Sequence, residues 1–168
     1  MPPTLATMDG LLAQCADLPT KTIDAGECLI EQGHDPGPLY VLVEGALVIE
    51  RDGVAFARID TPGAVFGEMA AVLGQQASAT ARVTEMSTFR VAEDPIAFLT
   101  ERPGAALEVL RIAATRLDAL TRYLADVKQQ YADLAGHLGM VDQVLNVLVH
   151  HHSEPVRPGS AREPDPDY

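Results

Sequence analysis

Residues 66–80 of this sequence read FGEMAAVLGQQASAT. A Gly-Glu pair follows the first residue, a short apolar run of helical character comes next, and small and hydroxyl residues then lead into a strand. Glycine and small residues let a ligand approach the backbone closely, because no bulky side chain intervenes. Consecutive backbone amides at the start of a helical turn can hold an anion. The stretch therefore predicts a ligand pocket, and we call residues 66–80 the cassette.

The residues on either side of the cassette have the pattern of an all-β fold. From residue 21 onward, short runs rich in β-branched residues alternate with glycine-bearing turns at a spacing of roughly 8–12 residues. Asp52-Gly53 is typical of a two-residue hairpin turn, because glycine takes a positive φ without strain. After the cassette, residues 79–92 predict two further strands, 80–83 and 88–91. Residues 21–103 are thus expected to form an antiparallel, jelly-roll-like β-roll.

Helices are expected at both ends of the roll, which makes the predicted fold class α+β. Residues 1–20 carry apolar side chains at helical spacing and predict an N-terminal helix. Asp94-Pro95 predicts the start of another helix, with aspartate as the cap and proline at the first helical position. Gly136 and Gly139 separate a long helix over residues 104–136 from a short one over 137–152. The charged, proline-rich tail 153–168 is expected to be disordered.

The long helix over residues 104–136 has apolar residues at alternating steps of four and three. They are Ala106, Leu110, Ala113, Leu117, Leu120, Leu124, Val127, Tyr131 and Leu134, and we call them the seam. A strict heptad repeat of this length is typical of a coiled coil. The sequence favours a homodimer formed through Leu110–Leu134. The alternative is a helix docked within its own subunit, which usually shows a wider apolar stripe.

Composition limits the function classes that are open to this chain. A length of 168 residues with 47% hydrophobic content suits one domain with a core and appendages. Twelve basic against 24 acidic residues give a formal net charge of −12, which disfavours DNA and anionic membranes as partners. The N-terminus lacks a signal-peptide layout, and no apolar run approaches about 18 residues. We expect a cytoplasmic protein.

Cysteine and histidine usage predicts neither a disulfide framework nor a metal site. Cys15 and Cys28 form no C-x-x-C pair, so two buried thiols are expected, with a single disulfide as the alternative. His150–His152 predicts a solvated helix end, because adjacent histidines on a helix cannot all face one ion. No nucleophile-base triad or paired carboxylates can be assembled, so the sequence predicts no enzyme, no cofactor and no metal.

These landmarks together resemble the cyclic nucleotide-binding domain family. The resemblance spans about residues 15–135 and is carried by an ordered set of residues: Gly26, Gly33, Leu39-Tyr40-Val41, Gly45, Gly53, Pro62-Gly63, Phe66-Gly67-Glu68, Ala79-Thr80, Phe98 and Pro103. The family fold is an eight-stranded β-roll with an N-terminal helix, a phosphate-binding cassette and a C-terminal lid helix. The resemblance implies that cAMP or cGMP is the ligand of the cassette.

The resemblance also implies roles for single residues. Glu68 matches the acid that binds the ribose 2′-hydroxyl, and the backbone of Gly67 and Met69 lies near the sugar. Ser78 and Ala79 match small residues that touch the phosphate, and Ala77 stands where the family has its phosphate-binding arginine. The implied ligand set is Phe66, Gly67, Glu68, Met69, Ala77, Ser78, Ala79 and Thr80, with a looser match at Thr121 and Arg122. The alternatives are that Glu68 stabilises a helical turn and that Ser78 and Thr80 are ordinary strand residues.

Ala77 is the departure from the family pattern. A guanidinium gives phosphate a charged, two-pronged donor, whereas a methyl group gives none. A charge-assisted hydrogen bond contributes about 1.5–3 kcal/mol, so its loss weakens binding roughly ten- to 150-fold. The cassette holds no Lys or Arg. Arg82 is five residues after Ala77, and an odd separation along a strand places the two side chains on opposite faces. Backbone amides and the hydroxyls of Ser78 and Thr80 are what we expect to replace it.

Two functions fit this sequence. In the first, the domain senses a nucleotide-type ligand and signals through its C-terminal helices to an unknown partner protein. In the second, the domain has lost sensing and serves as a dimeric protein-interaction module of the same fold. A helix-turn-helix segment is not expected after the long helix, which disfavours direct DNA regulation.

Overall fold

A computed structural model describes residues 5–130 of the chain. Its elements in chain order are α1 (Leu5–Gln14), β1 (Thr20–Ile23), β2 (Cys28–Ile30), β3 (Leu39–Arg51), β4 (Val54–Ile59), β5 (Val65–Phe66), α2 (Glu68–Leu73), β6 (Thr80–Ala92), α3 (Pro95–Glu101) and α4 (Pro103–Gln130). The predictions for the helix within 137–152, the tail 153–168, His150–His152 and the last seam residues lie outside the described residues. The chain divides into two compact units, Met1–Ala114 and Thr115–Tyr168.

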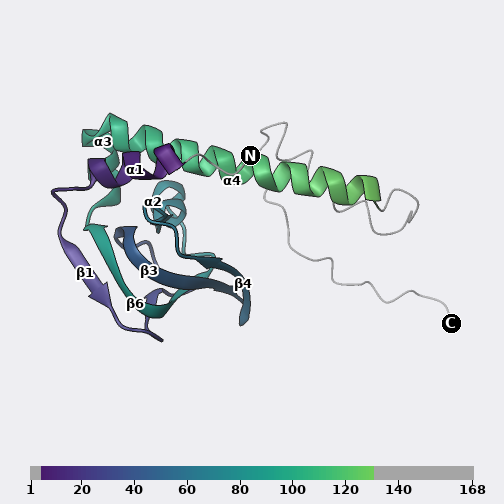
Figure 1. The fold of residues 1–168 in the computed structure, drawn as a ribbon, viewed down its shortest axis with the longest axis horizontal. Helices are drawn as coiled ribbons and strands as arrows, with labels where there is room; N and C mark the ends of the chain where they lie inside the picture. The colour runs from purple at the N-terminus through teal and green to yellow at the C-terminus, as the bar shows by residue number, and fades with distance from the viewer. Residues whose placement is uncertain (1–4, 131–168) are drawn as a thin grey trace. The chain divides into compact units, whose positions relative to one another are not determined.

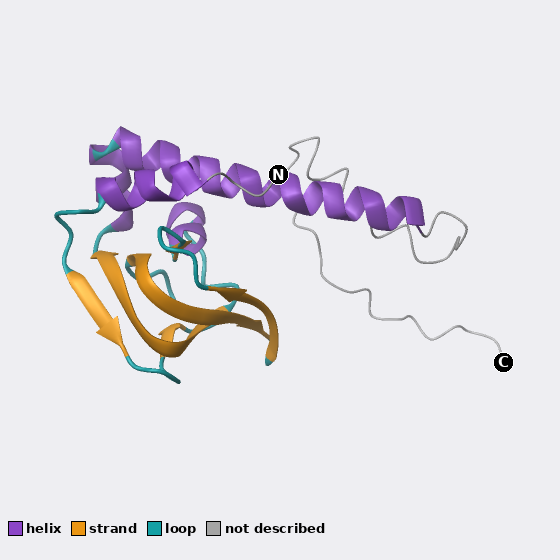
Figure 2. Cartoon of the chain, in the orientation of Figure 1, coloured by secondary structure: helices purple, strands orange, loops and turns teal. Residues whose placement is uncertain are grey.

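The sheet of the first unit is antiparallel throughout its described part. Strand order is β1-β6-β3-β4, with β2 also paired to β6 and β5 to β3. Figure 2 shows the two long strands, β3 and β6, curving together through the roll. With its N-terminal helix and long C-terminal helix, the structure confirms the predicted α+β β-roll.

Residues 80–92 form one strand, so the prediction of two separate strands in this segment is wrong. β6 keeps its pairing with β3 across several register shifts between Leu42 and Leu47. Bulges bend a strand and raise its twist without ending it. Gly45, at φ +107°, lies at this bend, and an added Cβ would meet the Ser87 Oγ at 2.1 Å. Ser87 is buried and its hydroxyl accepts from the Ala46 amide at 3.0 Å, which fixes the bend.

Two hydrophobic clusters lie on opposite faces of β3. Tyr40 and Leu42 belong to the cluster inside the roll, whereas Leu39 and Val41 belong to a cluster under the helices. Alternation of side chains along a strand explains this division. The helical cluster is completed by residues from α1, β5, β6, α3 and α4 together with Cys15: Leu11, Cys15, Val65, Ala92, Phe98, Ala105, Val109 and Ile112. Figure 1 shows α1, α3 and the first turns of α4 gathered at one end of the sheet.

Local sequence signals explain where several elements begin and turn. Asp52 (φ 52°) and Gly53 (φ 79°) both take positive φ between the paired strands β3 and β4, which confirms the predicted two-residue hairpin. The Asp94 carboxylate accepts from the Ala97 amide at 3.0 Å, and Pro95 is at the first position of α3. The predicted cap is therefore confirmed.

α4 has two apolar faces. Ala105, Val109 and Ile112 are buried in the helical cluster of the first unit. The seam is one residue along the helix from this face, and Leu110 is 62% exposed. In the second unit, described to residue 130, Leu117 and Leu120 are 45% and 48% exposed. The start of the helix therefore docks on its own domain by a face other than the seam, and a large part of the seam stays open.

The two cysteines are free thiols in different environments. Cys15 is buried, and burial raises the pKa of its thiol to about 11. Cys28 is exposed, so the expectation that both thiols are buried is wrong for Cys28. In β2 only the middle residue, Leu29, is fully buried, because successive side chains of a strand point to opposite faces.

Candidate functional site

The cassette forms a turn, a short helix and a return into the sheet. Gly67 follows β5 with φ 86°, and Gly74 ends α2 with φ 62°. A Cβ on Gly67 would meet the Pro38 carbonyl oxygen at 2.6 Å. Both the positive φ and this close approach require glycine. Gly67 thus brings the cassette backbone against the loop between β2 and β3.

The β2–β3 loop is fastened to the cassette by hydrogen bonds. The Gly33 amide donates to the Ala77 carbonyl at 2.8 Å, and the Ala77 amide donates to the His34 carbonyl at 2.9 Å. The Gln32 amide donates to the Thr80 hydroxyl at 3.0 Å. Of the polar groups expected to replace the missing arginine, the Ala77 amide is therefore already used as a donor within the chain, while the Thr80 hydroxyl is used as an acceptor.

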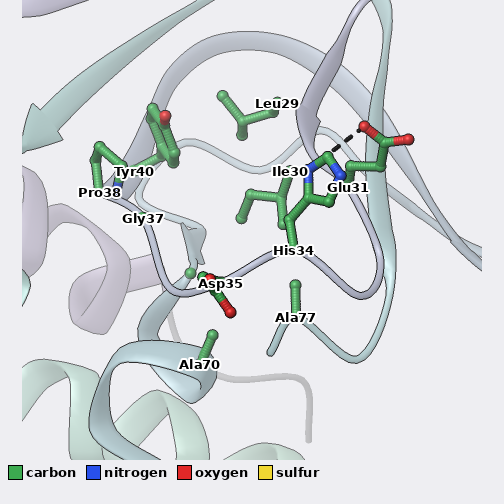
Figure 3. Close-up of a pocket in the computed structure, with 11 residues that line it drawn as sticks. Leu29, Ile30, Glu31, His34, Asp35, Gly37, Pro38, Tyr40, Ala70 and Ala77 are labelled. Carbon is green, nitrogen blue, oxygen red and sulfur yellow. Dashed lines mark ion pairs between the residues drawn. The ribbon is translucent and has the colours of Figure 1, made fainter. Parts of the chain in front are cut away.

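A pocket of about 180 Å³ lies between this loop and the cassette (Figure 3). Its lining residues come from β2, the β2–β3 loop, β3 and the cassette: Leu29, Ile30, Glu31, His34, Asp35, Gly37, Pro38, Tyr40, Gly67, Ala70 and Ala77. Apolar side chains and backbone supply most of this surface, as in small-molecule sites generally. The pocket is smaller than the roughly 300–1,000 Å³ that is common for such sites.

The charged side chains of the pocket are acidic. Glu31 and Asp35 line it, and no Lys or Arg is among its lining residues. The His34 Nδ1 lies 3.5 Å from a Glu31 carboxylate oxygen. Arg82, the base nearest the cassette in sequence, places its Nε 3.4 Å from the Glu50 carboxylate and donates to the Gly26 carbonyl at 3.2 Å. The lining therefore offers no Lys or Arg to a phosphate, its His34 lies beside Glu31, and Arg82 is held elsewhere.

The structure brings together only part of the predicted ligand set. Gly67 and Ala77 line the pocket. Phe66 is buried inside the roll, edge-on to Phe89 with ring centroids 6.4 Å apart. Glu68 is 7% exposed in the first turn of α2, where the helix dipole favours a carboxylate. Met69 is 54% exposed.

The remaining predicted residues lie after the cassette helix or on α4. Ser78 is exposed, whereas Ala79 and Thr80 are half-buried at the start of β6. Thr121 and Arg122 belong to the second unit, so they have no defined position relative to the pocket. The Thr121 hydroxyl donates to the Leu117 carbonyl at 2.8 Å, and Arg122 lies 2.7 Å from Asp118. Their looser match to the family's ligand set stays a prediction.

Sequence reasoning missed the loop side of the pocket, which is formed by Glu31, His34, Asp35 and Pro38. β2 pairs with β6 directly after the cassette, with Cys28 opposite Arg82. The loop that leaves β2 must therefore pass beside the cassette. The Pro36-Gly37-Pro38 turn was the local signal, but only the pairing shows which segment it faces.

Known proteins share this arrangement. A model of the cyclic nucleotide-binding domain matches residues 20–96. No curated protein sequence matches. Among solved structures, the catabolite activator protein of Thermus thermophilus superposes with a TM-score of 0.58 at 21% identity, over 74% of this chain and 59% of that one. The N-terminal domain of a Streptomyces coelicolor transcriptional regulator gives 0.50 at 24% identity, over 69% and 94%.

A third similar structure is the regulatory domain of Toxoplasma gondii PKA in complex with cAMP. Its TM-score is 0.54 at 18% identity, over 67% of this chain and 48% of that one. At these identities the structural likeness concerns the fold. The β-roll, the cassette and the flanking helices are the part of the fold that this chain shares with these structures. The match to the cyclic nucleotide-binding domain family covers residues 20–96.

Proposed function

We propose that this chain is a regulatory domain that senses a nucleotide-type ligand in the cassette pocket and signals through its C-terminal helices to a partner protein. The observation that carries the proposal is the intact frame of the cassette. Gly67 keeps its positive φ against the Pro38 carbonyl, α2 follows, and a pocket lies where the two meet. The role is regulatory and not catalytic.

α3 and the start of α4 can pass a displacement of the cassette on to the long helix within the first unit. Phe98 of α3 packs with Val109 and Ile112 of α4 in the same cluster as Val65 of β5, which directly precedes the cassette. Because a packed cluster transmits small displacements, movement of the cassette reaches the base of α4.

The exposed seam supports a homodimer through Leu110–Leu134 as the form in which the domain works. Leu110, Leu117 and Leu120 leave large apolar side chains open on a heptad repeat. Knobs-into-holes packing of a second copy would bury such a stripe.

Weak binding of cyclic nucleotide is part of the proposal. With Ala77 in place of a cation, the charge-assisted bond to phosphate is lost, and the Ala77 amide already donates to His34. We expect affinity for cAMP and cGMP in the millimolar range.

The second candidate is a domain that no longer senses nucleotide and acts as a dimeric interaction module. It is favoured by the acidic pocket lining and by the loop-to-cassette hydrogen bonds. Both functions predict the dimer, so the ligand response is what separates them.

Thermal unfolding with millimolar cAMP or cGMP tests the sensing part. Stabilisation of the protein, together with heat of binding in calorimetry, is the expected result. If neither nucleotide changes the melting temperature or gives heat, sensing of cyclic nucleotide is refuted and the interaction module stands.

Light scattering tests the dimer separately. The double variant Leu117→Asp and Leu120→Asp should be monomeric, because four carboxylates cannot share a desolvated seam. Ala119→Asp lies on the same exposed stretch outside the seam, and this control should stay dimeric. A monomeric native protein would refute the dimer.

A further inference from the structure

The acidic side chains that line the pocket can accept hydrogen bonds from a ligand that carries donors. Ionised carboxylates accept hydrogen bonds and donate none. Glu31 and Asp35 both line the pocket, and Asp35 takes only a 3.4 Å contact from the Gln76 amide group. His34 also lines the pocket and lies 3.5 Å from a Glu31 carboxylate oxygen, so Glu31 already faces a base. Asp35 would attract a cation and repel an anion.

A second polar group of the pocket, the Tyr40 hydroxyl, lacks a hydrogen-bond partner within the described structure while staying in contact with solvent. Tyr40 lines the pocket, is 7% exposed, and its hydroxyl forms no hydrogen bond with residues 5–130. Its ring is held edge-on to Phe89 with centroids 6.2 Å apart. Water can therefore bond this hydroxyl when no ligand is bound. A ligand in the pocket can take the place of that water.

The Tyr40 hydroxyl is protonated near neutral pH. Burial, followed by the charge of Glu93, raises the pKa of Tyr40 above its ordinary value of 10.0. The hydroxyl can therefore both donate to a ligand and accept from it. Leu29, Ile30 and Pro38 offer an apolar surface for the body of the same ligand (Figure 3).

We propose that the pocket binds a ligand carrying a protonated amino group at the place where a cyclic nucleotide carries its phosphate. Asp35 and Glu31 attract the amino group, Tyr40 bonds a polar group of the ligand, and Ala77 leaves the space that an arginine would fill. This inference rests on the proposed function, because it takes the cassette pocket to be the ligand site. The ligand expected at this site is therefore cationic, whereas a cyclic nucleotide is anionic.

Two nucleosides and one nucleotide that differ only at the 5′ position test the charge preference. They are 5′-amino-5′-deoxyadenosine, which is cationic at pH 7, adenosine, which is neutral, and AMP, which is anionic. Calorimetry on the full chain should rank them in that order. Each step is expected to be at most about fivefold, because the carboxylates are partly solvated. Equal affinities, a reversed order, or no binding of the amino compound at millimolar concentration would overturn the inference.

Two variants assign the preference to residues. Asp35→Asn should reduce the advantage of the amino compound over adenosine, whereas Asp24→Asn removes an equal charge outside the pocket lining and should leave it unchanged. Tyr40→Phe keeps the ring and should weaken all three ligands together. An unchanged ranking in Asp35→Asn would contradict the role given to that carboxylate.

The same measurements separate failure of this inference from failure of the proposed function. If AMP or cAMP binds and the amino compound does not, the inference fails while sensing of nucleotides stands. If none of the nucleosides or nucleotides binds, both fail, and the interaction module is left.

Discussion

At the junction of α1 with α3, Arg102 donates to both carboxylate oxygens of Asp17 at 2.6 Å and to the Gln14 carbonyl at 2.8 Å. At the pocket, the residue in the family's arginine position is Ala77, and the charged neighbours are acids. The junction holds a carboxylate with a well-placed guanidinium, whereas the pocket lining has no Lys or Arg to hold a phosphate. The Arg102–Asp17 pair fixes the helices, whereas the side chains of the pocket lining determine its charge.

The two regions also differ in how they are packed. Arg102 lies over the Phe98 ring, 5.2 Å from its centroid, beside a cluster of ten buried residues. The pocket depends instead on backbone hydrogen bonds between a loop and the cassette. Packed side chains at the junction should therefore dominate stability, while the pocket should tolerate changes that alter its chemistry.

Truncation of the junction core should give the largest effect. Phe98→Ala removes a ring that is 6% exposed, and we expect a loss of about 3–5 kcal/mol in the free energy of unfolding. Phe56→Ala removes a 63% exposed ring and should change it by less than about 0.5 kcal/mol. Urea unfolding followed by circular dichroism measures both. Equal losses would mean that the junction is not the packed centre described above.

A change in the frame of the pocket should have a smaller effect. Gly67→Ala combines a positive φ with a clash against the Pro38 carbonyl, and we expect a loss of about 1–3 kcal/mol. Gly37→Ala is the matched control, since an added Cβ there meets nothing within 4 Å. Urea unfolding of the two variants should separate them. If Gly67→Ala were as stable as Gly37→Ala, the close approach of loop and cassette would be refuted.

The Arg102–Asp17 pair should show in the pH dependence of stability. The hydrogen bond from Arg102 lowers the pKa of Asp17 from 3.8 to about 2 in the folded protein. A depressed folded-state pKa stabilises the protein above pH 3.8, and this stabilisation is lost as the pH falls toward 2. Arg102→Gln should remove this part of the acid dependence of the melting temperature. An identical pH profile in the variant would contradict the assignment.

The reactivity of the two cysteines probes the two regions without any substitution in the protein. Cys15 belongs to the junction cluster, whereas Cys28 lies in β2 two residues before the pocket residue Ile30. A thiol reagent at neutral pH should label Cys28 in the native protein and Cys15 only after unfolding, because the thiolate is the reactive form. Mass spectrometry of the labelled protein distinguishes the two sites. Rapid labelling of Cys15 would show that the junction opens.

The elements whose signals are local could be predicted from the sequence. Asp52-Gly53 predicted its hairpin and Asp94-Pro95 predicted the start of α3. The cassette glycine was expected to let a ligand approach the backbone, and in the structure the group close to Gly67 is the Pro38 carbonyl. In each case the decisive interaction lies within a few residues, or requires a backbone that only glycine adopts easily.

Features that depend on pairing across the fold could not be predicted. The loop residues Glu31, His34 and Asp35 reach the pocket because β2 pairs with β6, which is a contact about 50 residues apart in sequence. The heptad count on α4 also missed Val109 and Ile112, which are buried in the helical cluster. Each lies next to a seam residue, so the count assigned only one apolar face to the helix. Burial of Cys15 and exposure of Cys28 likewise depend on what covers each face.

The proposed function gives the pocket the frame of a nucleotide site without an arginine to hold the phosphate. Calorimetry of cAMP binding to the native protein and to Ala77→Arg tests it most directly, because the Ala77 side chain lines the pocket. The predicted result is weak binding by the native protein and a roughly ten- to 150-fold gain in the variant. Micromolar binding by the native protein, or a folded Ala77→Arg with no gain, would contradict the claim.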